Sequence, residues 1–101
     1  MRMIMLVQCP IEPFNTEVRN GTAGQKMKRI LDDIRPEAAY FSEREGKRGA
    51  ILIVNVNHPS DVPKLAEPWF LNFNAVVEFR ICMTPEDLAK ADLEELGKKW
   101  A

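Results

Sequence analysis

One stretch of this sequence, from Ala50 to Val56, is apolar at almost every position and constrains the fold more than any other. Gly49 precedes it, and a polar run that starts at Asn57 follows it. A strand that is apolar at consecutive positions is covered on both of its faces, whereas a strand with one solvent-exposed face has alternating apolar and polar residues. The stretch therefore predicts a central strand, and any fold for this chain must place material on both sides of it.

The length and composition are those of one ordinary globular domain. The chain has 101 residues, of which 46% are hydrophobic and 29% are charged, and its formal net charge is −1. Soluble domains cluster at roughly 100 to 150 residues, so residues 1–101 are predicted to form a single domain. A net charge near zero argues against a protein that binds a nucleic acid backbone, because such proteins normally carry a clustered basic excess.

Four apolar runs and three periodic segments give a simple order of elements. Strands are predicted at residues 2–9, 37–43, 50–56 and 75–83, and the glycine-containing turn 45–49 joins the second and third strands as a hairpin. Helices are predicted at residues 23–34, with 15 as the earliest start, and then at 61–73 and 85–96. Strands and helices therefore alternate along most of the chain.

Local signals place the ends of these helices. Thr22 begins a capping-box pattern, and Thr84 with Asp87 forms a second one around a proline at the first helical position. Pro68 falls inside the second helix and is expected to kink it or split it in two. Gly97 is expected to end the third helix.

The order β-α-β-β-α-β followed by a terminal helix is that of the ferredoxin-like fold, which belongs to the α+β class. Its antiparallel four-stranded sheet has the order 4-1-3-2, and both main helices lie on one face because the crossovers are right-handed. Yet the strands at 2–9 and 50–56 are apolar on both faces. Leaving about five such side chains in water forfeits roughly 1.5 to 3 kcal/mol each, so the second face needs a cover.

A second copy of the chain is the economical cover. A homodimer that packs sheet against sheet, with the terminal helices reaching over the joint, protects this face and also removes Trp100 from water. Such an assembly is a dimeric α+β barrel. The alternative is a monomer whose third helix folds over its own sheet.

Several segments carry a resemblance to a known family. They are the turn 46–49, the run 66–75 that begins Ala66-Glu67-Pro68-Trp69-Phe70, the pair Glu78-Phe79, and the segment 83–88. On these segments the sequence resembles a bacterial domain-of-unknown-function family within the dimeric α+β barrel superfamily. The resemblance covers most of the chain from Gly21 to Leu88, and it implies the ferredoxin-like fold and a dimer.

What the resemblance implies about activity is less specific. Relatives in the superfamily include cofactor-free monooxygenases, muconolactone isomerases and stress-response barrel proteins. They hold small, often aromatic ligands in a cleft between the sheet and its helices or between sheets. The shared motifs look structural, so no catalytic residue is carried over to this chain.

His58, Glu78 and Arg80 are the candidate catalytic residues. His58 is the only histidine and follows the central strand. An imidazole titrates near working pH and therefore suits a general base. Alternatively, His58 is a loop residue that is solvated or caps the next helix. Glu78 and Arg80 share a face of the fourth strand, where a carboxylate beside a guanidinium suits binding of an organic acid or transfer of a proton. The alternative is an ion pair that fixes the register of strands or subunits.

Tyr40, Asn55 and Trp69 are the candidate substrate-binding residues. Tyr40 and Asn55 supply a hydroxyl and an amide, and Trp69 suits the wall of an apolar pocket, although aromatic residues at helical spacing usually belong to a core. Two hypotheses follow. The first is a site that binds, or transforms without metal or bound cofactor, a small and largely apolar organic compound. The second is a non-catalytic dimeric module whose polar residues are structural.

Other classes of partner are not expected. RNA-recognition modules with this fold stack bases on aromatic residues of the third strand, whereas here Arg48 and Gly49 are followed by aliphatic residues. One histidine and the separated Cys9 and Cys82 cannot fill a tetrahedral metal site. No run has the length of a membrane span and the N-terminus lacks the features of a secretory signal, so a cytoplasmic protein without a membrane partner is expected.

Overall fold

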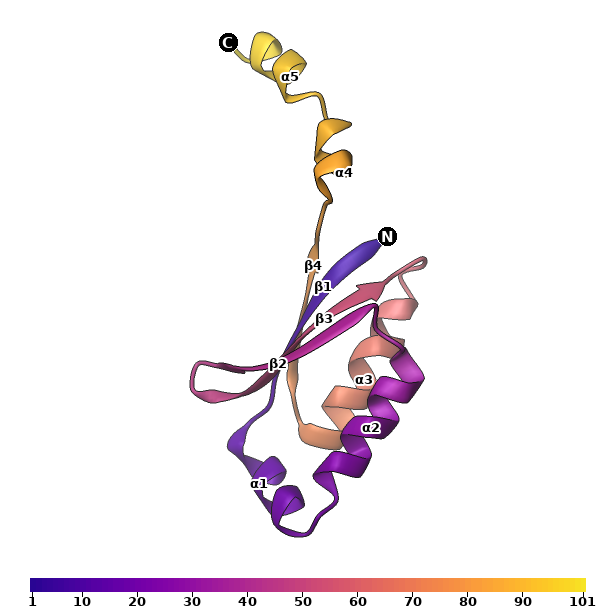
Figure 1. Cartoon of the computed structure of the whole chain (residues 1–101), viewed down its shortest axis with the longest axis vertical. Coiled ribbons are helices and arrows are strands. Elements are labelled where there is room, and N and C mark those ends of the chain that lie inside the picture. Colours follow the sequence, from indigo (N-terminus) through magenta and orange to yellow (C-terminus); the bar gives the residue numbers. More distant parts are fainter.

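A computed structural model describes all residues 1–101 and shows an α+β fold with one antiparallel sheet (Figure 1). The strands are β1 (Arg2–Gln8), β2 (Ala38–Arg44), β3 (Lys47–Asn55) and β4 (Val76–Ile81), and their order in the sheet is β2-β3-β1-β4. This is the predicted order 4-1-3-2 read from the other edge. The ferredoxin-like arrangement with β1 and β3 at the centre of the sheet is therefore confirmed.

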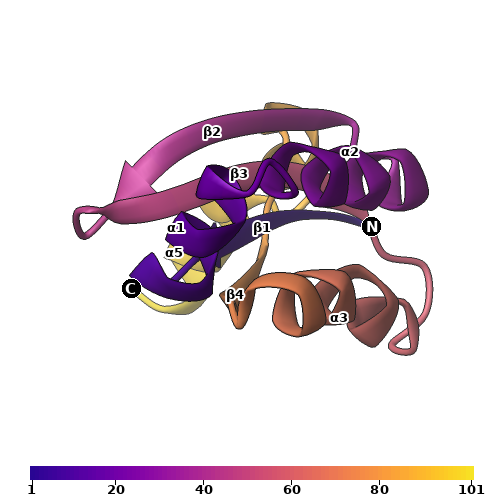
Figure 2. The same ribbon diagram turned by 90° about the horizontal axis from the view of Figure 1, so that it is seen from below.

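The helices form a single layer on one face of the sheet. The helices α2 (Ala23–Ile34) and α3 (Asp61–Phe73) pack against each other there, and α1 (Ile11–Arg19) lies at one end of this layer and contacts both (Figures 1 and 2). The last two helices, α4 (Pro85–Ala89) and α5 (Leu93–Lys99), extend beyond the end of β4 (Figure 1).

The core lies between the sheet and this helical layer. Alternate residues of a strand point to opposite faces, and Met5 and Val7 of β1 and Leu52 and Val54 of β3 are all at most 1% exposed. They pack with Trp69 and other aromatic residues of the helices. The side chains of opposite parity on β1 and β3 point away from the helices, so they form the open face that the sequence predicted to need a cover.

The β2–β3 hairpin turns earlier than the sequence suggested. The turn residues with positive φ are Glu45 (53°) and Gly46 (75°), and β3 has already begun at Lys47. Gly49 lies within the strand, where an added Cβ would be 2.9 Å from the carbonyl oxygen of Val7. The second glycine is therefore required by the close approach of neighbouring strands and not by the turn.

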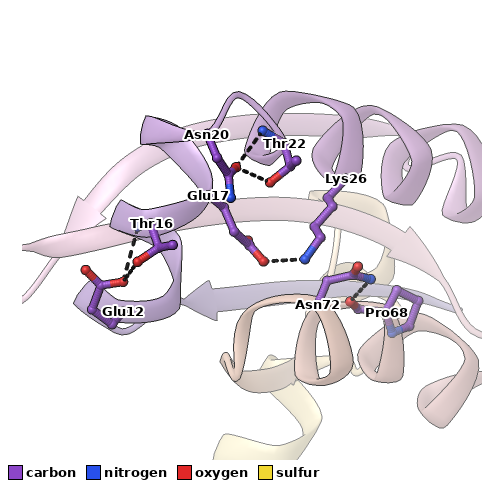
Figure 3. Close-up of polar contacts among 8 residues, drawn as sticks. All are labelled: Glu12, Thr16, Glu17, Asn20, Thr22, Lys26, Pro68 and Asn72. Atoms are coloured by element: carbon purple, nitrogen blue, oxygen red, sulfur yellow. Dashed lines mark hydrogen bonds and ion pairs between the residues drawn. The ribbon is translucent and has the colours of Figure 1, made fainter.

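The segment before α2 forms a helix of its own. Residues 11–19 are helical except at Glu12, whose backbone is extended (φ −111°, ψ 145°), and Gly21 (φ 81°) lies between this helix and α2. The helix predicted at 23–34 is confirmed, whereas its possible earlier start at 15 is wrong. The predicted capping box at Thr22 is also wrong. Thr22 makes no side-chain cap, and its N–H (3.1 Å) and hydroxyl (2.6 Å) donate to the Asn20 side-chain oxygen instead (Figure 3).

Pro68 does not split the second predicted helix, because α3 runs without interruption from Asp61 to Phe73. The carbonyl oxygen of Pro68 accepts a hydrogen bond of 2.7 Å from the side-chain amide of Asn72, one turn later (Figure 3). Side-chain donors of this kind satisfy backbone groups near the end of a helix, where intrahelical partners run out.

The predicted third helix is broken into α4 and α5. Thr84 and Asp87 form the predicted capping box at the start of α4, with reciprocal hydrogen bonds of 3.1 Å. Asp92 then adopts a left-handed conformation (φ 53°) and caps α5 through its side chain. Gly97 lies inside α5, so its predicted role as the end of the helix is wrong.

Residues 82–101, here called the C-terminal arm, project from the body as an extension of β4 (Figure 1). The molecule measures 60 × 28 × 19 Å and has a radius of gyration of 17.2 Å, whereas a compact chain of this length has about 13 Å. Neither α4 nor α5 has a buried residue. The arm therefore does not cover its own sheet. None of the helices combines the length and apolarity needed to cross a membrane.

Candidate functional site: an apolar cavity under the hairpin

The best-formed cavity lies between α1, the β2–β3 hairpin and the helical side of the sheet. Its volume is about 640 Å³, which falls within the range of roughly 300 to 1,000 Å³ typical of small-molecule sites. Eight of its 15 lining residues are hydrophobic. The lining consists of Val7, Cys9, Ile11, Phe14, Asn15, Met27, Phe41, Ser42, Glu43, Gly46, Lys47, Arg48, Gly49, Ala50 and Trp69.

Aromatic packing holds the helical wall of the cavity in place. Trp69 and Phe73 are both fully buried and lie one turn apart on α3, so they face the same side of that helix. The ring of Phe14 stacks on Phe73 with centroids 4.7 Å apart, which ties α1 to α3. The indole N–H of Trp69 is buried and has no hydrogen-bond acceptor.

A partly buried ion pair ties α1 to α2. Glu17 is 9% exposed, and its carboxylate accepts a hydrogen bond from the ammonium group of Lys26 (Figure 3). One oxygen of Glu17 remains without a partner. Removing one member of a buried pair leaves an uncompensated charge, so the pair helps to fix the position of α1 over the cavity.

Two cations stand at the rim of the cavity, on the first residues of β3. The guanidinium of Arg48 lies 4.6 Å from the centroid of the Phe14 ring and donates a hydrogen bond of 2.8 Å to the Asn15 side chain. Lys47 lines the rim beside it. The only carboxylate on the lining, Glu43, accepts a hydrogen bond of 2.7 Å from the Gly46 N–H and is thereby held at the turn.

Cys9 is the one thiol on the lining, and it is 3% exposed. Burial raises the pKa of the Cys9 thiol, and the positive charge of Arg48 offsets part of this effect. A raised pKa keeps the thiol protonated at neutral pH, so Cys9 acts there as a small apolar wall residue and not as a nucleophile.

The predicted site residues do not converge on this cavity, and Trp69 alone among them lines it. His58 is exposed in the loop before α3, where its backbone N–H and that of Asn57 donate to the Asp61 carboxylate at 3.1 and 3.0 Å. These bonds lower the pKa of Asp61. Asn55, at the far end of β3, accepts a hydrogen bond of 2.9 Å from the N-terminal ammonium group.

Tyr40, Glu78 and Arg80 lie on the opposite side of the sheet, on the open face. Glu78 forms ion pairs with Arg44 at 3.0 Å and with Arg80 at 3.5 Å, and all three side chains are partly or largely in water. The phenol of Tyr40 is 64% exposed. The sheet therefore separates these groups from the cavity, and the Glu78 pairs have the geometry of the structural alternative.

Sequence reasoning missed Phe14, Phe41 and Arg48, which form much of the cavity. Phe41 occupies the alternate parity to Tyr40 on β2, and this alternation is the signal that separates a residue facing the helices from one facing the open side. In the sequence, Arg48 and Gly49 match only the first two positions of an RNA-binding motif and give no sign of a cavity rim. No sequence signal brings Phe14 to Arg48, because their contact depends on the position of α1.

The open face is the second unusual surface of the molecule. Apolar side chains from three adjacent strands meet there, as the register pairs Ile4 with Ile53, Leu6 with Ile51, and Ile51 with Tyr40. The C-terminal arm also exposes its apolar residues, which include Leu88, Leu93, Leu96 and Trp100. A contiguous apolar surface rimmed by polar groups is typical of a protein–protein contact.

Comparisons with known proteins assign no family to this chain. No protein-family model matches the chain, and a comparison with curated proteins finds no match. Among solved structures the chain is similar to a de novo designed protein, Ferredog-Diesel, with 14% identity over 79% of this chain and 83% of that chain and a TM-score of 0.40.

Proposed function

We propose that this protein is a small-molecule-binding domain that holds a small and largely apolar organic compound in the cavity under the hairpin. The observation that carries the proposal is the cavity itself, about 640 Å³ in volume and walled mainly by hydrophobic residues. Its polar groups are few and lie at the rim, an arrangement that orients a ligand while apolar burial supplies affinity. Binding, rather than a reaction, is the role that this lining supports.

The proposal includes a homodimer of the barrel type, in the cytoplasm, as the assembled form. Its support is the apolar patch on the open face together with an arm whose helices have no buried residue. Helices of five and seven residues are too short to persist in water without packing. A second copy supplies what each surface lacks, because its arm reaches the open face of the first.

Charge also favours this pairing. Residues 82–101 contain five acidic and three basic side chains, whereas the open face presents the guanidinium groups of Arg2, Arg44 and Arg80, which pair with the two carboxylates of Glu37 and Glu78 and leave a small basic excess. An acidic arm and a basic face attract each other and steer two copies together.

The test of binding is an NMR titration with a neutral apolar probe, 1-naphthaleneacetamide, using ¹⁵N-labelled protein. We expect saturable shifts of the amide signals of Phe14, Phe41 and Ala50. The matched variants are Phe41→Ser, which alters the cavity, and Tyr40→Ser, which alters the open face one residue away. Weaker binding in Phe41→Ser alone supports the proposal, and equal binding in both variants or no saturable binding to the wild type contradicts it.

The second candidate function is a non-catalytic dimeric module with no ligand. The pairing of Glu78 with Arg44 and Arg80 favours it, because these groups then serve only to fix the sheet. The same titration decides between the two, since this candidate predicts no saturable binding of the probe.

A further inference from the structure

We propose that the ligand of this cavity is an organic acid, whose apolar body enters the cavity and whose carboxylate is held at the rim by Arg48 and Lys47. This inference rests on the proposed function, and it adds the chemical class of the ligand. It comes from the charges at the rim, which are independent of the apolar walls that support binding in general.

The rim cations lack anionic partners in the folded chain. Neither Lys47 nor Arg48 takes part in any of the ion pairs of the structure. The nearby carboxylates bind other groups: Glu43, which lies opposite Arg48 in the strand register, accepts from the Gly46 N–H, and Glu12 accepts from the N–H and hydroxyl of Thr16 (Figure 3). The rim therefore carries two cations against the one carboxylate of Glu43, a net charge of about +1 that favours an anion.

The Arg48 guanidinium is also ordered before a ligand arrives. The Phe14 ring lies under it at 4.6 Å and the Asn15 oxygen holds it at 2.8 Å, so only part of its five-donor fork is used. A guanidinium with free donors in a fixed plane binds a carboxylate through two parallel hydrogen bonds. Because its side chain is already positioned, less conformational entropy is lost when the acid binds.

The two halves of the site select for an amphipathic molecule. The apolar walls formed by Met27, Ala50 and Trp69 disfavour a small, fully hydrated anion such as acetate. The cations at the rim favour an acid over a neutral compound of the same shape. An aromatic or aliphatic carboxylic acid satisfies both, with the ring or chain inside and the charge at the entrance.

The test compares two probes of nearly equal shape, 1-naphthaleneacetate and 1-naphthaleneacetamide, by calorimetry and NMR titration at pH 7. We expect the acid to bind about fivefold more tightly than the amide, because Lys47 and Arg48 are exposed at the rim and water weakens their attraction for the carboxylate. Arg48→Gln should weaken binding of the acid more than binding of the amide and so remove the preference, and Lys47→Gln should reduce the preference. Lys64→Gln, a variant of an exposed lysine on α3 that lies off the cavity, is the control for net charge.

The outcomes separate the two proposals. Equal binding of acid and amide, or a preference for the acid that survives Arg48→Gln, overturns the assignment of an organic acid while leaving a binding site in place. Binding of neither probe overturns both proposals. The amide spectra of each variant, compared with those of the wild type, show whether the fold is retained. If Arg48→Gln does not fold, Lys47→Gln tests the same preference for the acid.

Discussion

Charging the centre of the open face should break the proposed homodimer and leave the fold intact. Ile51 is 40% exposed and pairs with Leu6 on one side and with Tyr40 on the other. Burying an isoleucine fully stabilises by roughly 1.5 to 3 kcal/mol, so the exposed part accounts for about 1 kcal/mol in each copy. Ile51→Glu removes this contribution and places a carboxylate in the contact.

Each copy of a symmetric homodimer carries the substitution, so its effect on dimer stability is counted twice. An unpaired carboxylate in a buried interface costs about 2 kcal/mol at the low end. Each copy loses about 1 kcal/mol of apolar contact and about 2 kcal/mol for the buried charge. The two copies together therefore weaken the dimer by about 6 kcal/mol, which raises Kd on the order of 10⁴-fold. The free energy of unfolding of the monomer should fall by only about 1 to 2 kcal/mol, because the part of Ile51 that is not exposed already packs within the monomer.

The assay is light scattering after size exclusion, with protein at roughly 1 to 100 μM so that a micromolar Kd or a tighter one gives a dimer. Phe41→Glu is the matched control, because it places the same charge on the adjacent strand but on the helical side, and its mass should remain that of the wild type. A wild type that is monomeric at every concentration, or an Ile51→Glu variant that stays dimeric, would refute the reasoning.

Three further predictions concern single groups. Lys26→Met should destabilise the fold by about 1 to 3 kcal/mol in urea unfolding, because it leaves the Glu17 carboxylate buried without its partner, and an unchanged midpoint would argue against a buried pair. Asp61→Ala should lower stability at neutral pH. The pKa of Asp61 is lowered in the folded state, so its contribution is complete above the unfolded pKa of about 3.9 and disappears as pH falls through the folded value; the difference between the two proteins should vanish in acid. In the monomeric variant, a thiol reagent should modify Cys82 quickly and Cys9 only after unfolding, since Cys9 is buried, and equal rates would contradict this placement.

The central strand made most of the fold predictable. A run of consecutive apolar residues at 50–56, a hairpin signal before it and a helix signal after it leave few topologies once crossovers must be right-handed. The same run of apolar residues does not indicate which of its side chains face the helices. Because both parities are apolar, the sequence alone could not say that Leu52 and Val54 face the helices while Ile51 and Ile53 face outward.

The candidate site was harder to predict, for two physical reasons. The cavity is assembled by α1, whose position over the hairpin depends on the stacking of Phe14 on Phe73 and not on any local pattern. The polar residues that the sequence singled out, such as Tyr40 and Glu78, lie on the open face, and the cavity lies on the other side of the sheet. Only Trp69, placed by helical spacing, was assigned to the correct side.

The central claim is that a small apolar compound binds on the helical side of the sheet, under the hairpin. Isotope-filtered NOE spectra of the protein with saturating 1-naphthaleneacetamide test it most directly. We predict contacts from the naphthalene protons to the methyl groups of Met27 and Ala50. Contacts to Ile51 and Ile53 instead would place the ligand between sheets and contradict the account.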